Sequence, residues 1–324
     1  MARTMLLSAC VAVVTGLAPP TTARSLLNVV RANDCAGADA EKARAFIVGD
    51  EILGRVLPRS AEQLSRFEER FEVTETSVRL RDESAWVDGD LVSLRSAAVA
   101  ACIEQLRDDD SVPSLRGWRD ELLAVRRSFH SPPSLLIERA AAPLFGAGGY
   151  GVFVNGYVCD TSPTTPSAIW LGRRAPTKPT WPGLLDCIAA GGVAAGELPV
   201  AAMRKECGEE AGIPPDLAAC ARPAGGVSYT GFSECGWGLK QDNLYTFDLE
   251  LPLGFEPTPV DGEVSAFSLV PVNEVVELLL SPENCFKPNV GVIIIDFLMR
   301  HGVLEPDEDG YLELLGALRN APCR

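Results

Sequence analysis

The chain has 324 residues, of which 47% are hydrophobic and 23% are charged, and its formal net charge at pH 7 is −15. This length and composition are those of a globular protein with one large or two ordinary domains, and they exclude wholesale disorder. So acidic a chain repels nucleic acid and anionic membranes, and no basic cluster with interleaved aromatic residues offsets the charge, so we expect no nucleic-acid partner.

The first 24 residues have the layout of a targeting leader. Arg3 is followed by an apolar run from Met5 to Ala18 and then by prolines and small polar residues. The run is too short for a comfortable membrane span, so we expect a leader cut near Ala18 or Ala23 and no stable span in the mature chain. The pattern leaves open a plastid or mitochondrial destination, the secretory route, and otherwise the cytoplasm.

Residues 25–146 are predicted to form a helix-rich α+β accessory domain. Apolar residues three and four positions apart predict helices, and an alternating segment at 70–80 predicts a strand. The predicted helices cover residues 39–53, 58–71, 97–109 and 115–128. No constellation of titratable residues stands out in this part of the chain.

The segment GAGGYG, Gly146 to Gly151, formally matches the dinucleotide-binding pattern GxGxxG. That pattern requires a helix directly after the glycines. The following residues, VFVNGYV, alternate as a strand does. We therefore interpret the glycines as a linker and turn between two domains.

Residues 147–304 have an α/β pattern, and residues 305–324 are predicted to form a helical tail. Alternating or apolar runs predict strands, and longer apolar runs with helix-start and helix-stop residues predict helices. The strands are expected at 151–158, 167–174, 182–193, 243–252 and 264–272, and the helices at 199–211, 272–280 and 288–302.

The helix at 199–211 begins at Pro199 and is expected to end before Gly212. Val200, Met203 and Cys207 follow a spacing of three and four and predict an apolar stripe along it.

Three glutamates lie next to this stripe. Glu206 and Glu210 are four residues apart, and Glu206 and Glu209 are three apart, so their carboxylates are neighbours on the helix surface. Like charges at this spacing repel, and a divalent cation relieves the repulsion. Hard oxygen ligands of this kind favour Mg²⁺, or alternatively Mn²⁺.

The surrounding segment, GGVAAGELPVAAMRKECGEEAGI, resembles the Nudix box, G-x5-E-x7-R-E-U-x-E-E-x-G-U with U an apolar residue. Gly191 opens the motif, Glu197 is its first acid, and Glu206, Glu209 and Glu210 are the later acids. The resemblance implies a Nudix hydrolase with an α/β/α sandwich and a mixed sheet, preceded here by the smaller accessory domain.

The resemblance also implies roles for these residues. Glu206, Glu209 and Glu210 would be metal ligands, Glu206 a base acting on water, and the carbonyl of Gly191 a further ligand. Glu197 would support the geometry of the loop and the helix.

A later loop often adds one more acid in this family, and Glu263 in PVDGEVSAF is the candidate. The alternative for Glu263 is ordinary turn acidity next to Asp261-Gly262.

One position departs from the motif, because Lys205 stands where the family has arginine. Lysine keeps the charge but lacks the planar fork that orients carboxylates. We expect this change to affect the catalytic rate more than metal binding.

The resemblance extends beyond the box to a Nudix subgroup with an extra N-terminal domain, often labelled thiamine pyrophosphokinase-related. It rests on SLLNVVRANDC, KECGEEAGIP, YTFDLELP, CFKPNVGVIIIDFLMRHG and GYLELLGALR. It implies hydrolysis of thiamine diphosphate, or of damaged forms such as oxythiamine diphosphate, to the monophosphate. The chain has no P-loop pattern GxxxxGK[ST] that would indicate a kinase.

Substrate selectivity must come from outside the box. Tyr229, Phe232 and Trp237 are candidates for a ring-stacking wall, and Lys240 is a candidate phosphate contact. Packing of the aromatic residues and a surface position for the lysine are the alternatives. The same two interpretations apply to three further residues: Lys287, Trp170 and Trp181.

Other functions stay open at this stage. The chain could hydrolyse nucleoside diphosphate derivatives such as ADP-ribose or NADH, or it could bind such a ligand without catalysis, for which Lys205 is the motivating feature. An isomerase on the same scaffold would need an added acid or nucleophile, for which Cys187 and Cys207 are candidates. Ten cysteines without a CxxC pair and only two histidines argue against a zinc site. The oligomeric state is not predicted.

Overall fold

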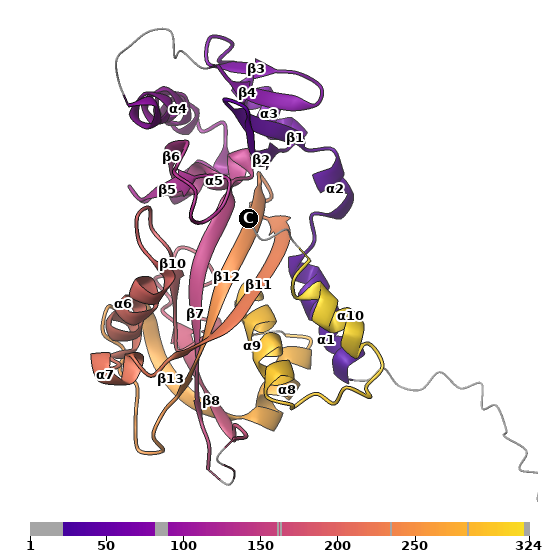
Figure 1. The fold of residues 1–324 in the computed structure, drawn as a ribbon, viewed down its shortest axis with the longest axis vertical. Helices are drawn as coiled ribbons and strands as arrows, with labels where there is room; N and C mark the ends of the chain where they lie inside the picture. The colour runs from indigo at the N-terminus through magenta and orange to yellow at the C-terminus, as the bar shows by residue number, and fades with distance from the viewer. Residues whose placement is uncertain are drawn as a thin grey trace, which may run out of the picture.

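The computed structural model describes residues 22–81, 90–160, 162, 164–233, 235–283 and 285–320. The apolar run from Met5 to Ala18 lies outside these ranges. Within them, no helix combines the length and the apolarity that crossing a membrane requires. Figure 1 shows a large sheet with helices on both faces and a smaller unit at one end of it.

The smaller unit is built from residues 37–146, which we call the accessory unit. Its first sheet has the strand order β2-β1-β4-β3, and β5 and β6 form a separate antiparallel hairpin. The strands are β1 (Arg44–Val48), β2 (Glu51–Val56), β3 (Phe71–Val73), β4 (Ser77–Leu80), β5 (Leu122–Val125) and β6 (Leu135–Glu138). The helices are α2 (Gly37–Glu41), α3 (Pro58–Leu64), α4 (Leu91–Asp108), η1 (Pro113–Gly117), η2 (Arg139–Ala141) and α5 (Ala142–Phe145).

One of the predicted helices in this unit is confirmed, one is confirmed in part and two are wrong. Helix α4 lies where the apolar spacing predicts it, whereas α3 matches only the first half of its prediction, ending at Leu64, and Phe71 begins β3. Residues 39–53 instead hold the end of α2, all of β1 and the start of β2, because Gly49 at φ +59 turns the chain back on itself. Residues 115–128 end η1 and form β5, which pairs with the next strand, β6, in an antiparallel hairpin. The single strand predicted at 70–80 is a hairpin of β3 and β4.

The large sheet has the order β11-β12-β7-β8-β13, with β10 paired to β7 and β9 paired to β8. Its strands are β7 (Gly148–Val158), β8 (Ala168–Arg174), β9 (Leu185–Asp186), β10 (Ala189–Gly192), β11 (Arg222–Phe232), β12 (Leu239–Glu250) and β13 (Val264–Pro271). Residues 148–151, predicted as a linker and turn, already belong to β7, whereas Gly146 ends α5 in the left-handed conformation.

Two different strands, β10 and β8, pair with successive parts of one edge of β7. Residues 151–154 pair with β10, and residues 156–158 pair with β8. On its other edge, β7 runs parallel to β12 over its whole length. The sheet therefore divides between β10 and β8 at residue 155 of β7, close to Ala190, whose N–H contacts Glu210 in the last turn of the helix Pro199–Ala211.

Helices cover both faces of this sheet, which confirms the predicted α/β/α sandwich. Helices α6 (Pro199–Ala211) and α7 (Pro215–Ala218) cover one face, where their apolar residues share a core with Val152, Val154 and Phe247. The other face is covered by α1 (Thr22–Asn33), α8 (Val272–Leu280), α9 (Pro288–Arg300) and α10 (Tyr311–Ala317).

Helix α1 belongs to the core of the large sheet. Its buried residues Ala23, Leu26, Leu27 and Val30 share a core with α9 and with Leu314 of α10. Figure 1 shows α1 and α10 side by side. The predicted leader cut near Ala23 falls inside this helix, whereas a cut near Ala18 would leave it whole.

A buried polar network links β12 to α9. The carboxylate of Asp248 accepts hydrogen bonds from Asn155 and from Arg300, both at 3.0 Å, and lies 3.0 Å from the His301 ring nitrogen Nε2. Burial alone would raise the pKa of Asp248, but these partners lower it to about 2. These partners therefore keep the carboxylate of Asp248 negatively charged at neutral pH.

Candidate active site

Helix α6 has the bounds that the sequence predicts. Pro199 lies in its first turn, and Gly212, at φ +61, ends it in the left-handed conformation. Met203 and Cys207 are buried against the sheet as predicted, but Val200, the third member of the predicted stripe, is 43% exposed. The helix is thus held along its length beside the point where β10 leaves β7.

Glu210 points from α6 into the protein. It is 6% exposed, and its Oε2 accepts a hydrogen bond of 2.8 Å from the backbone N–H of Ala190. Burial, reinforced by the negative charge of Asp186, raises the pKa of Glu210 well above its usual value. A buried carboxylate without a full cationic partner favours a bound cation, because the cation restores the charged form.

Glu206 packs against the backbone of β10. A Cβ atom on Gly191 would lie 2.2 Å from Oε1 of Glu206, so any larger residue at this position would displace the Glu206 side chain. The Glu206 side chain is 15% exposed, and burial raises its pKa above the ordinary value. Gly191 and Glu206 are therefore in direct contact, although they are fifteen positions apart in the sequence.

Lys205 and Glu209 lie on the solvent side of the same helix. The Lys205 amino group is 3.9 Å from Glu206 and 3.7 Å from Glu209, and its own side chain is 52% exposed. The Glu209 side chain is 54% exposed. Lys205 thus contacts two acids of the motif as a point charge, in a geometry looser than an arginine fork would give.

The loop before β13 is hydrogen-bonded to the end of α6. The N–H of Thr258 donates to the carbonyl of Ala211 at 3.0 Å, and the N–H of Asp261 donates to the carbonyl of Glu209 at 3.1 Å. This loop brings carboxylate oxygens of Asp261, Glu263 and Glu210 within 4.8 Å of one another. We call these three residues the carboxylate triad.

The triad differs from the set of ligands that the sequence predicts. It contains Glu210 and Glu263, but not Glu206 or Glu209. It also contains Asp261, which is not among the predicted ligands and which the sequence suggested only as part of the turn next to Glu263. The available signal was the position of Asp261, two residues before the candidate acid Glu263.

Glu263 is held by two contacts. Its backbone N–H donates to Oδ1 of Asp261 at 2.8 Å, and its carboxylate forms an ion pair with Lys178. Burial alone would raise the pKa of Glu263, but Lys178 lowers it below its usual value. The Lys178 side chain is only 12% exposed, so a buried ammonium group neutralises part of the acidic site.

The donor set fits a hard divalent cation. All three groups of the triad are carboxylates, which are the ligands that Mg²⁺ and Mn²⁺ prefer, and burial raises the pKa of Glu210 well above its usual value.

The motif's first acid, Glu197, lies in the loop that leads into α6. Its N–H donates to the carbonyl of Ala194 at 3.1 Å, and its carboxylate accepts from the N–H of Ala194 at 3.4 Å. These contacts close the loop locally before α6 begins, and the supporting role of Glu197 stays a prediction.

The candidate substrate contacts are dispersed. Tyr229 is 6% exposed, lies in the core beneath α9, and donates its hydroxyl to Asp242 at 2.7 Å. Trp237 packs against the core of the accessory unit, and Lys240 is half-buried in β12. The structure therefore favours packing in the protein interior over a ring-stacking wall for Tyr229 and Trp237.

Lys287 is also held inside the protein. Its amino group lies 3.1 Å from the buried carboxylate of Asp186, to which Arg174 donates at 2.9 Å. The arrangement holds β8, β9 and the start of α9 together, so Lys287 is neither exposed nor unpaired.

The two candidate cysteine nucleophiles are buried. Burial raises the pKa of Cys207 to about 12 and that of Cys187 well above its usual value. Both thiols are thus neutral at physiological pH, whereas a nucleophilic cysteine requires the thiolate.

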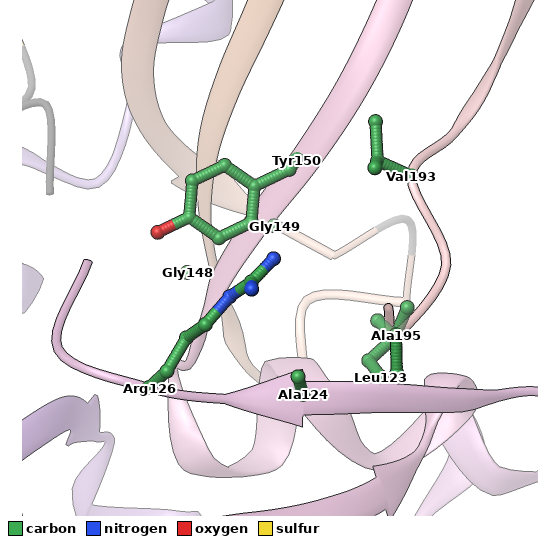
Figure 2. A pocket seen from close by; sticks show the side chains of 8 residues that line it. All are labelled: Leu123, Ala124, Arg126, Gly148, Gly149, Tyr150, Val193 and Ala195. Carbon is green, nitrogen blue, oxygen red and sulfur yellow. The ribbon is translucent and has the colours of Figure 1, made fainter. Parts of the chain in front are cut away.

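A small pocket lies where the accessory unit meets the loop after β10. Figure 2 shows Arg126 reaching toward Tyr150, with Val193 and Ala195 on the opposite side. The Arg126 guanidinium is 4.3 Å from the centre of the Phe129 ring and 5.3 Å from that of Tyr150. The accessory unit therefore contacts the loop that joins Gly191 to α6.

Two family models match adjacent parts of the chain. The model of a domain of unknown function (DUF4743) matches residues 25–148, and that of the NUDIX domain matches residues 151–289. Nudix hydrolase 24, chloroplastic, of Arabidopsis thaliana is 42% identical over 229 residues, which are 71% of this chain and 60% of that protein. The NUDIX domain of Shewanella oneidensis NrtR, solved with ADP ribose, is 15% identical with a TM-score of 0.36, over 48% of this chain and 90% of that one.

Another relative, Nudix hydrolase 20, chloroplastic, of Arabidopsis thaliana, is 38% identical over 282 residues, which are 86% of this chain and 73% of that protein. Because this match spans both parts of the chain and most of the relative, the chain belongs to the Nudix hydrolase family and is a pyrophosphohydrolase.

Proposed function

We propose that this enzyme is a Mg²⁺-dependent hydrolase that cleaves thiamine diphosphate, or an oxidised form of it, to the monophosphate. The observation that carries the proposed metal chemistry is the carboxylate triad, whose oxygens lie within 4.8 Å of one another. The substrate rests on the resemblance of the chain to the thiamine pyrophosphokinase-related subgroup.

Nudix hydrolases generally use divalent metal ions. The triad would hold the cation, together with the Glu206 carboxylate and the carbonyl of Gly191. Glu206 belongs to α6 and contacts Gly191 in β10. Glu209 would join them by rotation of its exposed side chain away from Lys205. When bound, such a cation neutralises charge on the phosphates and lowers the pKa of an attacking water.

A side chain of the protein would then accept a proton from the attacking water. Glu206 is the proposed base, because burial raises its pKa toward neutrality while its side chain stays partly accessible. It takes one proton from the water as the water oxygen bonds to phosphorus and the bridging P–O bond breaks. The products are the monophosphate ester and inorganic phosphate.

Two other functions remain as alternatives. Hydrolysis of ADP-ribose or NADH would use the same acids with a different organic pocket. A module that binds its ligand without catalysis is motivated by Lys205, whose contacts of 3.7 and 3.9 Å are loose. The neutral thiols of Cys187 and Cys207 argue against an isomerase that uses either as its nucleophile.

We also propose that the leader, predicted at residues 1–24, directs the chain to an organelle of the plastid type and ends at residue 21, before the helix that begins at Thr22. Two relatives carry the word chloroplastic in their names. Fluorescence microscopy of the full chain fused to a reporter, compared with a chain that starts at Thr22, tests this assignment. Diffuse fluorescence from both fusions would contradict it.

A substrate panel tests the proposed activity. Turnover of thiamine diphosphate, oxythiamine diphosphate, ADP-ribose and NADH is measured with and without Mg²⁺, by phosphate release for the two thiamine compounds, with Glu206→Gln as the inactive reference. NADH and ADP-ribose release no phosphate directly, so their products are separated by chromatography. Mg²⁺-dependent turnover of the thiamine compounds supports the proposal. Preferred turnover of ADP-ribose or NADH would show that the substrate is a nucleotide and not a thiamine compound. Absence of turnover with all four compounds would favour a module that binds its ligand without catalysis.

A further inference from the structure

The loop that joins β8 to β9, residues 175–184, is attached to the acidic site, and we call it the β8–β9 loop. The N–H of Ala175 donates to the backbone carbonyl of Glu263 at 2.8 Å, and Lys178 forms an ion pair with the Glu263 carboxylate. Glu263 is a member of the carboxylate triad. The loop is therefore fixed next to the proposed metal site by two direct contacts.

Arg174, the last residue of β8, anchors the second half of this loop. Its side chain is 9% exposed, and its guanidinium donates to the carbonyl of Trp181 at 3.0 Å and to that of Thr180 at 2.8 Å. The same guanidinium donates to the buried carboxylate of Asp186 at 2.9 Å. Because Arg174 directly precedes Ala175, one short segment of chain holds both the backbone of Trp181 and the backbone of Glu263.

The backbone of Trp181 is strained. Its φ is +53°, in the left-handed region that bulky side chains rarely adopt. Such strain persists only where neighbouring contacts impose it, and it is common at ligand-binding sites. Here the hydrogen bonds from Arg174 hold the backbone, so they also fix the direction in which the indole leaves the loop.

Trp181 differs in its surroundings from the other tryptophans that the structure describes. Trp118 and Trp237 pack against the core of the accessory unit, and Trp170 packs against the core that α6 covers. Among the described residues, Trp181 joins none of the hydrophobic cores, and it is partly exposed. Its aromatic surface is therefore not committed to the protein interior.

The position of Trp181 suits the organic part of a substrate whose phosphates are bound at the triad. Trp181 follows Lys178 by three residues, and three residues of chain span at most about 11 Å. The indole is thus carried close to the acid that Lys178 contacts. We propose that Trp181 stacks on the aromatic ring of the substrate, and that the β8–β9 loop thereby selects which diphosphate is bound.

This inference rests on the proposed function, since it assigns the ring of that substrate to one residue. An indole attracts another aromatic ring, and it attracts a cationic ring more strongly. The thiazolium ring of a thiamine compound is cationic, whereas the adenine ring of a nucleotide is neutral. Stacking on Trp181 therefore favours thiamine compounds over nucleotides.

Calorimetry with the full chain and Mg²⁺ tests the contact with three ligands. Thiamine monophosphate and AMP each have a ring but no diphosphate to hydrolyse, and methylene diphosphonate has no ring and cannot be hydrolysed. Trp181→Leu and Trp181→Phe share the same backbone constraint and differ in whether a ring is present. Trp118→Leu is the matched control, because the Trp118 ring stacks on Arg107 of the accessory unit at 4.4 Å.

We expect Trp181→Leu to raise the Kd for thiamine monophosphate by about fivefold or more, as removal of a stacked aromatic side chain does. Trp181→Phe should recover most of the lost affinity. Neither variant should change the Kd for methylene diphosphonate, and KM for thiamine diphosphate should rise more than kcat falls. Melting temperatures show whether each variant folds.

The inference is overturned if Trp181→Leu and Trp118→Leu have equal Kd values for both ring compounds, or if the unchanged protein binds neither compound. An equal loss of affinity for methylene diphosphonate in Trp181→Leu overturns it too, because the loop would then support the metal site and not the ring. Failure of the proposed function alone has a different result. The unchanged protein would bind AMP more tightly than thiamine monophosphate, and Trp181→Leu would weaken the binding of AMP.

Discussion

The backbone N–H of Ala190 in β10 donates a hydrogen bond of 2.8 Å to the buried carboxylate of Glu210 in α6. This contact joins the end of the short strand to the acidic helix, and it places a carboxylate whose pKa is raised by burial beside the loop that carries Asp261 and Glu263. Four predictions follow from the geometry around this point and from the buried network beneath α9.

Glu210→Gln should lower kcat by about 10²–10⁴-fold, as much as loss of an acid–base group does, because the cation that would activate the water loses a charged ligand. The fold should survive, because glutamine can still accept the hydrogen bond from Ala190 and no longer buries a charge. Initial rates and thermal unfolding measure the two effects. Glu274→Gln, at an exposed position in α8, is the control. Full Mg²⁺-dependent turnover in the Glu210 variant would contradict its role as a ligand.

Asp261→Asn should weaken Mg²⁺ binding by about tenfold or more, because one charged ligand becomes a neutral amide. Asparagine keeps the oxygen that accepts from the N–H of Glu263, so the turn should remain. Titration with Mn²⁺, followed by its paramagnetic resonance signal, measures the affinity. An unchanged affinity would mean that Asp261 only shapes the loop.

Lys205→Arg should hold or raise kcat if the lysine is a loosened substitute for the motif's arginine. The arginine fork can contact Glu206 and Glu209 together, whereas the lysine amino group now lies 3.7 and 3.9 Å from them. Steady-state kinetics at saturating Mg²⁺ measures the change. A large fall in kcat would show instead that the site depends on the smaller amine.

Asp248→Asn should destabilise the protein by about 3–5 kcal/mol at neutral pH, because it removes one partner of a buried charged network. The pKa of Asp248 is lowered from 3.8 to about 2, so the stability that its charge contributes is present above pH 3.8 and is lost as the pH falls toward 2. The difference in the free energy of unfolding between Asp248→Asn and the unchanged protein should therefore decrease as the pH falls from 3.8 toward 2.

Urea unfolding at neutral pH and melting temperatures from neutral to acid pH measure both effects. Asp309→Asn removes an exposed pair with Arg24 and should change stability much less. A difference in stability between Asp248→Asn and the unchanged protein that stays constant down to pH 2 would show that the charge of Asp248 does not stabilise the fold.

The sequence predicts best where local signals and burial agree. Helix α6 runs from Pro199 to Ala211 as expected, because its start and stop residues are local and its buried face is periodic. Residues 39–53 show the opposite case. Their apolar spacing suits a helix, but pairing of β1 with β4, which lies beyond the next helix, makes them strands.

The site was predictable to the extent that it is local. The motif identifies Glu206 and Glu210, and the resemblance to the family suggests one more acid in a later loop, Glu263. Asp261 enters the triad only because Thr258 and Asp261 bond to the carbonyls at the end of α6, a contact between segments about fifty residues apart. The rotamers of Glu209 and Lys205 likewise depend on their ion pair, which a motif does not specify.

The placement of α1 has a practical consequence for dissecting the enzyme. Since α1 packs against α9 and α10, the accessory unit is inserted between the first helix and the first strand of the catalytic sheet. A shortened protein that starts at Gly148 would strip four buried apolar residues from the core and expose the helices they cover. An isolated catalytic body should instead be made by excising residues 37–146 and splicing α1 to β7 with a flexible tether.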